Sequence, residues 1–303
     1  MNLETNFLGV KFQNPFVLPS GIMSVKAVSL ATAIKNGYGG VTSKSISKNS
    51  RAGHRPPILW GNANYYINAV GLTNPGLEEA INELKKFKSM SPASLIANIF
   101  AGSLEEFAEV TQGINQAPHD FLEINLSCPN VGKEFGDPFA YSASAVSAIT
   151  KKVKAISKVP VIIKLSPNAW NIVEIAKAAE SAGADALTAI NTMSGMVIDI
   201  KKRKPILSNK RGGVSGPALF PVALRCVYDI YEAVKIPIVG TGGITSGKDA
   251  LAMVMAGATL LGVGSALYYH GNEAIKKIIA EMEQIMQEEK IGSLEEIRGA
   301  AHY

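Results

Sequence analysis

The chain has 303 residues, 47% of them hydrophobic and 18% charged, with a formal net charge of +5; this balance is typical of a folded protein with a sizeable core. Its two cysteines leave no room for a disulfide framework or a cysteine-based metal site, and no metal is expected. No apolar run approaches the roughly 20 residues of a transmembrane helix, and the first ten residues lack the layout of a signal peptide, so we expect no membrane contact and a cytoplasmic location.

Short apolar runs alternate along the chain with Ala-rich amphipathic stretches, which is the pattern of repeated βα units around a parallel sheet. The eight runs lie at 16–20, 39–44, 95–99, 121–126, 161–165, 186–190, 236–240 and 260–264. The expected helices include 104–115, 143–158, 172–182, 246–256 and a closing helix at 272–289. Eight units predict an α/β fold with one domain over residues 1–303, a (β/α)8 TIM barrel with extended loops over its C-terminal face.

Two connections, 45–75 and 192–217, are longer than the two to six residues usual for loops between such units. Long loops in a compact barrel are usually lids or binding loops, so we place the functional face on their side. The second connection carries the densest basic run, 201–204. Because no aromatic platform or DNA-binding motif accompanies this run, it predicts a solvated loop and no nucleic-acid partner.

Polar residues collect at the ends of the predicted strands, where a barrel of this kind forms its active site. They are Ser20, Gly21, Ser43, Lys44, Ser45, Asn98, Asn125, Cys128, Lys164, Asn191 and Thr192. A single polar residue at a strand end is commonly a loop anchor. A whole ring of them favours a ligand site.

Glycines follow the last two strands, within 238–249 and 261–265. They let backbone N–H groups approach an anion, and the turns after strands seven and eight are the usual phosphate site of this fold. A phosphorylated ligand or cofactor is therefore expected there. The first segment nearly matches two nucleotide motifs, but Asp249 replaces the Ser or Thr of a P-loop, and Thr245 replaces the third glycine of a dinucleotide fingerprint.

Lys44 and Lys164 are expected near the barrel mouth, where two chemistries are open to them. Burial could lower the pKa of an amine enough for Schiff-base formation, or the lysines could stay charged and stabilise a reduced cofactor. Four asparagines, at positions 68, 125, 130 and 191, each offer a donor and an acceptor. They favour the second chemistry and a ligand with an amide-like edge.

Six strings carry a resemblance to a known family: NAVGL at 68–72, NLSCPN at 125–130, KLSPN at 164–168, NT at 191–192, GGVSGP at 212–217 and GGI at 242–244. Together they resemble the class 1 dihydroorotate dehydrogenases over about residues 8–271. The resemblance implies FMN at the barrel mouth, surrounded by Ser20, Gly21, Lys44, Ser45, Asn98, Asn125, Lys164, Ile190, Ser215, Gly216, Gly242, Gly243, Gly264 and Ser265. It implies a substrate site formed by Lys44, Asn68, Ala69, Val70, Gly71, Leu72, Asn125, Asn130, Asn191 and Thr192.

The resemblance also implies the reaction, which is the oxidation of (S)-dihydroorotate to orotate in de novo pyrimidine (UMP) biosynthesis. Cys128 and Lys44 would be the catalytic residues, with Cys128 taking the C5 proton while a hydride leaves C6 for flavin N5. A free thiol titrates near ~8.5, so Lys44 or loop dipoles must lower the pKa of Cys128. Cys226, within an apolar helical pattern, is expected to be an inert buried residue.

The stretches 131–137 and 212–228 resemble the B branch of class 1, although the first is shortened. In that branch a second subunit with FAD and an iron–sulfur cluster passes electrons to NAD⁺, and this chain has neither cluster cysteines nor a Rossmann fingerprint. The resemblance therefore implies such a subunit in trans, around a homodimer of this chain. Three alternatives stay open: a related FMN-dependent dihydropyrimidine reductase or dehydrogenase, an A-type enzyme that uses fumarate, and a catalytically silent phosphate-binding scaffold.

Overall fold

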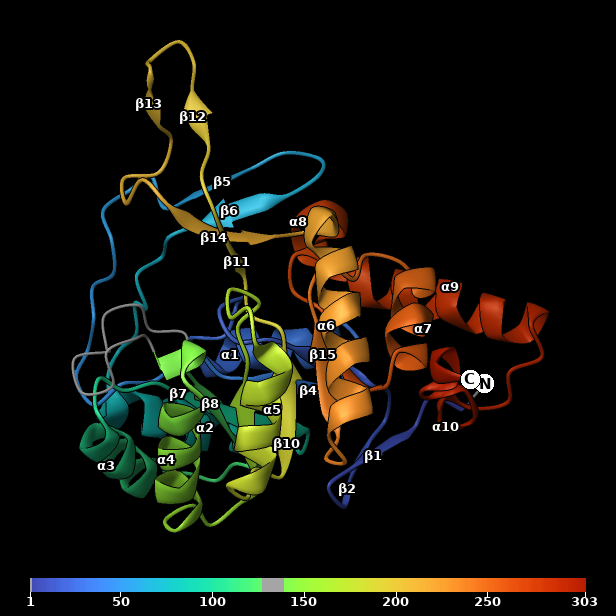
Figure 1. The fold of residues 1–303 in the computed structure, drawn as a ribbon, viewed down its shortest axis with the longest axis horizontal. Coiled ribbons are helices and arrows are strands. Elements are labelled where there is room, and N and C mark those ends of the chain that lie inside the picture. The colour runs from blue at the N-terminus through green and yellow to red at the C-terminus, as the bar shows by residue number, and fades with distance from the viewer. Residues whose placement is uncertain (1, 127–138) are drawn as a thin grey trace.

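Eight parallel strands close into a barrel in the computed structural model, which describes residues 2–126 and 139–303 (Figure 1). Around the barrel the order is β10-β15-β16-β3-β4-β7-β8-β9. The strands are β3 (Phe16–Leu18), β4 (Gly40–Thr42), β7 (Ser94–Ile99), β8 (Phe121–Asn125), β9 (Val161–Lys164), β10 (Ala186–Ala189), β15 (Ile238–Thr241) and β16 (Ala258–Gly262). The predicted (β/α)8 barrel is confirmed, with small shifts at the strand ends.

Helices connect the strands and cover the outside of the barrel (Figure 1). They are α1 (Ala27–Lys35), α2 (Leu77–Met90), α3 (Leu104–Ile114), α4 (Ala143–Lys154), α5 (Ile172–Ser181), α6 (Phe220–Ala233), α7 (Gly247–Met255), α8 (Ala266–His270), α9 (Ala274–Glu288) and α10 (Leu294–Ile297). Single 3₁₀ turns lie at Phe139–Tyr141, Pro217–Leu219, Gly271–Glu273 and Ala300–His302. The predicted closing helix is α9, and across the described ranges no helix has the length and apolarity to cross a bilayer.

The segment that nearly matches a P-loop is the start of α7. The Ser246 hydroxyl accepts a hydrogen bond from the Asp249 N–H at 3.1 Å, and the Asp249 carboxylate accepts one from the Ser246 N–H at 3.0 Å. This reciprocal pair is a capping box, which satisfies backbone donors that the first helical turn leaves open. Asp249 therefore stabilises the N-terminal end of a helix.

A short hairpin that the sequence analysis did not predict closes the N-terminal end of the barrel. Its strands are β1 (Thr5–Phe7) and β2 (Val10–Phe12). Phe7 and Phe12 are fully buried and pack on Phe121 of β8, with the Phe7 and Phe121 ring centroids 5.3 Å apart. Around them lies a purely apolar layer inside the barrel, formed by Val17, Ile96, Ile162, Ala186, Val239 and Leu260. This layer seals one end, so ligands can enter only from the other.

The two long connections were expected to be loops, but they contain strands. They pair with each other in a four-stranded antiparallel sheet, in the order β11-β14-β6-β5, above the C-terminal end of the barrel (Figure 1). Its strands are β5 (Leu59–Gly61), β6 (Tyr66–Asn68), β11 (Met193–Gly195) and β14 (Gly212–Ser215). Beyond it projects a hairpin of β12 (Ile198–Asp199) and β13 (Lys204–Pro205), and the basic run 201–204 in its turn is exposed, as predicted.

Candidate active site

Above the apolar layer, the interior of the barrel becomes polar. Side chains two residues apart on a strand point to the same face, so one strand can contribute residues to successive layers. On four neighbouring strands, an apolar residue of the sealed layer is followed by a polar one: Ile96 by Asn98, Phe121 by Glu123, Ile162 by Lys164 and Ala186 by Thr188. We call Asn98, Glu123, Lys164 and Thr188 the polar layer.

Glu123 is the centre of the polar layer. Asn98 Nδ2 donates to Oε1 of Glu123 at 2.5 Å, and Thr188 Oγ1 donates to Oε2 at 2.6 Å. The ammonium of Lys164 lies 3.7 Å from Oε1, and the side chains of this ion pair are only 7% and 4% exposed. Because a buried charge without a partner is strongly unfavourable, the ion pair and the two hydrogen bonds are what allow both charges to be inside.

Glu123 is not among the predicted site residues, because it lies inside a strand and not at its end. A signal was present in FLEIN at 121–125, where a carboxylate stands in an otherwise apolar strand. The period of two places Phe121, Glu123 and Asn125 on one face, and a charged side chain on the inner face of a barrel strand requires a partner.

One layer higher, four of the predicted site residues form a connected chain of hydrogen bonds across the barrel mouth. The Ser20 and Ser45 hydroxyls are 3.3 Å apart, and Asn125 Nδ2 donates to Ser45 Oγ at 3.3 Å. Asn191 Nδ2 then donates to Asn125 Oδ1 at 3.4 Å. These residues follow or end four different strands, so the closed barrel is what brings them together.

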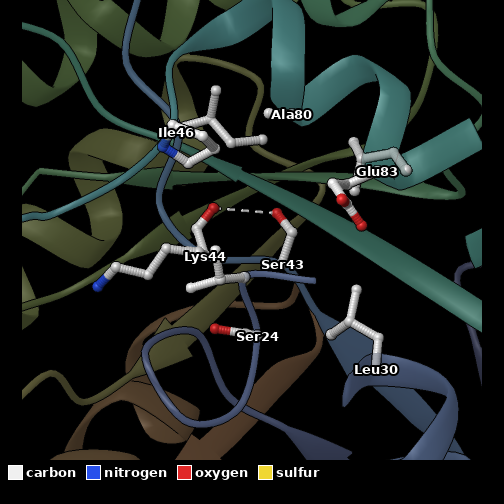
Figure 2. Close-up of a pocket in the computed structure, with 10 residues that line it drawn as sticks. Ser24, Leu30, Ser43, Lys44, Ile46, Ala80 and Glu83 are labelled. Atoms are coloured by element: carbon white, nitrogen blue, oxygen red, sulfur yellow. Dashed lines mark hydrogen bonds between the residues drawn. The ribbon is translucent and has the colours of Figure 1, made fainter. Parts of the chain in front are cut away.

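Lys44 extends toward the same mouth from the end of β4. Its backbone N–H donates to the Ser24 carbonyl at 2.8 Å, which fixes the start of the side chain. Figure 2 shows the Lys44 side chain turned away from Glu83, whose carboxylate accepts instead from the Ala27 N–H at 2.7 Å and from Lys26 Nζ at 2.9 Å. Burial, and then the positive charge of Lys164, lower the pKa of Lys44. The positive charges of Lys44 and Lys164 make this mouth favourable for an anion.

The predicted phosphate turns have the backbone geometry that an anion site needs. Gly243 has φ +74°, and a Cβ there would lie 2.6 Å from the Phe220 nitrogen and 2.8 Å from the Gly216 carbonyl. A Cβ at Gly264 would lie 3.0 Å from Pro19 Cγ. Within residues 2–126 and 139–303, the N–H groups of Gly243, Gly264 and Ser265 donate no hydrogen bond. Glycine is thus required at Gly243, and three free donors surround these turns.

The sheet over the mouth holds another group of predicted residues. Asn68, at the end of β6, donates from Nδ2 to the Gly213 carbonyl at 3.2 Å, and a Cβ on Gly213 would lie 2.0 Å from Thr192 Oγ1. Asn68 and Thr192 therefore lie on either side of Gly213. Ala69 and Val70 are fixed by a residue that the sequence analysis missed, His54: its N–H donates to the Val70 carbonyl at 3.1 Å, and its Nδ1 lies 3.1 Å from the Ala69 carbonyl.

The rest of this segment and three further predicted residues also lie around the mouth. Gly71 and Leu72 continue the turn with φ +78° and +57°. Ile190 is buried and donates its N–H to the Thr241 carbonyl at 2.8 Å, and the Gly21 N–H donates to Ser24 Oγ at 2.9 Å. Ser215 ends β14 opposite Tyr66.

Two predicted residues, Cys128 and Asn130, lie outside the described residues, so the roles expected for them stay predictions. Cys226 is buried on α6, and burial raises the pKa of its thiol, which agrees with the expected apolar setting. In the part of the chain that the structure describes, no cluster of three His, Cys, Asp or Glu side chains could hold a metal ion.

The barrel is sealed at one end and carries a polar layer inside. Its open end has a ring of amides and hydroxyls and glycine turns with free donors. These features define a (β/α)8-barrel enzyme with its active site at the C-terminal face. A family model described as dihydroorotate dehydrogenase matches residues 2–286. The chain belongs to the dihydroorotate dehydrogenase family.

Curated relatives cover nearly the whole chain. It is 41% identical over 303 residues to the "Dihydroorotate dehydrogenase B (NAD(+)), catalytic subunit" of Methanocaldococcus jannaschii, covering 99% of this chain and 98% of that protein. It is 42% identical over 301 residues to the protein of the same name from Methanothermobacter thermautotrophicus, with 99% and 98% covered. The one from Pyrococcus abyssi is 41% identical over 299 residues, with 99% of both chains covered.

Proposed function

We propose that the chain is an FMN-dependent catalytic subunit that oxidises (S)-dihydroorotate to orotate in de novo pyrimidine biosynthesis. Membership of the family and the names of the relatives support this reaction. The observation that carries the proposal is the hydrogen-bonded chain Ser20, Ser45, Asn125 and Asn191 across the mouth, directly above the buried Lys164. This chain of hydrogen bonds connects the polar layer to the amide side chains at the mouth. The arrangement suits a flavin on the polar layer with the dihydroorotate ring above it.

The residues present fit FMN. The free N–H groups of Gly243, Gly264 and Ser265 would hold its phosphate. Inside the described part of the barrel, the buried oxygens Asn98 Oδ1 and Thr241 Oγ1 have no hydrogen-bond partner, which matches the polar edge of a ring that enters the mouth. Bound FMN supplies the acceptor for the hydride. Lys164 would stay charged beside it, so the Schiff-base alternative is not adopted.

The substrate fits the mouth by charge and by hydrogen-bonding pattern. Dihydroorotate carries one carboxylate and a ring with amide-like N–H and C=O groups. Lys44, whose side chain turns away from Glu83 in Figure 2, would bind the carboxylate of dihydroorotate. The amides of Asn68, Asn125 and Asn191 would pair with the ring, together with Thr192, the turn at 69–72 and Asn130.

The C5 proton needs a base, and we assign it to Cys128. The C5–H bond breaks and an S–H bond forms, while C5 and C6 become doubly bonded as the hydride leaves C6. Cys128 follows Asn125 on the chain by only a few residues, so the end of β8 connects the base to the amide ring. Lys44 would favour the thiolate by its charge.

Electrons would leave through a partner. The names of the relatives include NAD⁺ and describe a catalytic subunit, which supports a separate electron-transfer subunit. As the resemblance implies, we expect that subunit to carry FAD and an iron–sulfur cluster and to dock on a homodimer of this chain. The glycine turns with free donors after β15 and β16 would be used by FMN. We therefore expect the pure chain to reduce dyes or oxygen but hardly NAD⁺ until that subunit is added.

The test is a visible spectrum of the purified chain, with identification of the released cofactor by mass. About one FMN per chain supports the proposal, and a colourless protein that takes up no FMN indicates the scaffold alternative. Binding of orotate and uracil then separates the reactions, because tight binding of uracil with weak binding of orotate would indicate a dihydropyrimidine reductase. Efficient turnover with fumarate would indicate an A-type enzyme. Fast NADH formation by the pure chain would overturn the proposal that a partner subunit is needed.

A further inference from the structure

Glu123 has no role in the proposed reaction, yet it is the most constrained charged residue in the barrel. It is 3% exposed, and both of its carboxylate oxygens accept hydrogen bonds, from Asn98 at 2.5 Å and from Thr188 at 2.6 Å. It lies one layer below the mouth, two residues before Asn125 on β8. At that depth it is too low to contact the substrate ring, but it is adjacent to the floor on which a flavin would lie.

The charge that faces Glu123 is that of Lys164. The Lys164 ammonium lies 3.7 Å from Oε1, and the other residues that hold the carboxylate, Asn98 and Thr188, are uncharged. Lys44 is the other cation near this floor, and its charge interacts with Lys164. Without Glu123, two lysines would repel each other inside the barrel, and among the described residues no other buried carboxylate could balance them.

We propose that Glu123 is a positioning residue that fixes Lys164 beneath the barrel mouth and cancels its charge, and so sets how strongly the site prefers reduced over oxidised flavin. This inference rests on the proposed FMN site. A bare ammonium under the flavin would strongly favour the negatively charged reduced form. An ion pair of Glu123 and Lys164, with no net charge, favours the reduced flavin less, so electrons can pass on to the next acceptor.

The geometry offers a substitution that changes charge with little change of shape. In Glu123→Gln, the amide oxygen can still accept from Asn98, and the amide nitrogen can donate to the Thr188 hydroxyl. Lys164 then has no counter-charge. We expect the ratio of affinities for reduced and oxidised FMN to rise about tenfold or more, which is an increase of about 30 mV in the midpoint potential of a two-electron couple.

Two further variants separate charge from structure. Thr188→Val removes one hydrogen bond to the carboxylate and keeps both charges, so we expect lower stability without a comparable rise in potential. Lys164→Met combined with Glu123→Gln removes both charges. Compared with Lys164→Met alone, the double variant should show no further rise in potential, because a Glu123 side chain buried without Lys164 would not keep its charge.

The experiment is a redox titration of bound FMN against a reference dye, with FMN affinity measured on the apoprotein of each variant. The inference is supported if the midpoint potential of bound FMN rises in Glu123→Gln, but not in Thr188→Val and not when Glu123→Gln is added to Lys164→Met. An unchanged or lower potential in Glu123→Gln overturns it, as does an equal rise in both backgrounds. If Glu123→Gln does not fold, recovery of folding in the double variant supports charge pairing, and failure of both variants overturns it.

These outcomes can be told apart from failure of the proposed function. The potential is measured without dihydroorotate, so a chain that binds FMN but does not oxidise dihydroorotate still tests Glu123. A wild-type chain that binds no FMN overturns the proposed function and this inference with it.

Discussion

Replacing Gly243 by alanine should show how much the phosphate turn depends on glycine. At φ +74° an L-residue is strained by roughly 1–2 kcal/mol. The added Cβ would also lie 2.6 Å from the Phe220 nitrogen and 2.8 Å from the Gly216 carbonyl, both backbone atoms that cannot rotate away. Overlap of this kind typically adds about 1–3 kcal/mol. We therefore expect Gly243→Ala to lower the free energy of unfolding by about 2–5 kcal/mol in total.

Gly271 is the matched control, because its φ is +67° and a Cβ there would have no atom within 4 Å. Gly271→Ala should lower the free energy of unfolding only by backbone strain, about 1–3 kcal/mol at φ 67° and ψ −160°. Urea unfolding of both apoproteins gives the difference, and FMN titration gives the effect on the site. In Gly243→Ala the turn must move, so FMN affinity should fall at least tenfold, whereas Gly271→Ala should bind FMN like the wild type. Equal stability of the two variants, with equal FMN affinity, would refute the close approach at Gly243.

Three further changes test other parts of the site. Cys128→Ala should keep FMN and bind orotate but slow flavin reduction by dihydroorotate roughly 10²–10⁴-fold in stopped flow, with Cys226→Ala as a catalytically normal control. Lys164→Ala should lower FMN affinity or slow flavin reduction by dihydroorotate, and unchanged FMN affinity with normal reduction would remove Lys164 from the site. The folded chain holds the Lys44 proton less tightly than the unfolded chain does. Below the ordinary pKa of 10.5, urea unfolding should therefore show the wild type gaining stability over Lys44→Met as pH rises through the lowered pKa, and a flat difference would contradict the burial of Lys44.

Local sequence patterns were enough to predict the barrel, because each βα unit repeats the same pattern of a short apolar strand and an amphipathic helix. They could not predict the sheet over the mouth, which forms between Asn68 of one connection and Gly213 of another, far apart in sequence. The hairpin that places Phe7 on Phe121 pairs locally, Thr5 with Phe12, but its two strands of three residues are too short to show a period of two. Long-range pairing is decided by tertiary contacts that short windows do not contain.

Some residues of the candidate site could be predicted from the sequence and others could not. Residues at strand ends, such as Ser45, Asn125 and Asn191, were predicted because the fold itself gathers strand ends at one face. Glu123 was missed because it lies inside a strand, where only the period of two shows that it faces inward. The free donors of the glycine turns depend on backbone geometry, so the sequence could indicate them only through glycine.

The most direct test of the central claim is an anaerobic titration of the purified chain with dihydroorotate, followed by the absorbance of its bound flavin. We expect the flavin to bleach with about one equivalent of dihydroorotate and orotate to appear in equal amount, while dihydrouracil has no such effect. A flavin that stays oxidised with excess dihydroorotate, or that bleaches only with dihydrouracil, would contradict the proposed function.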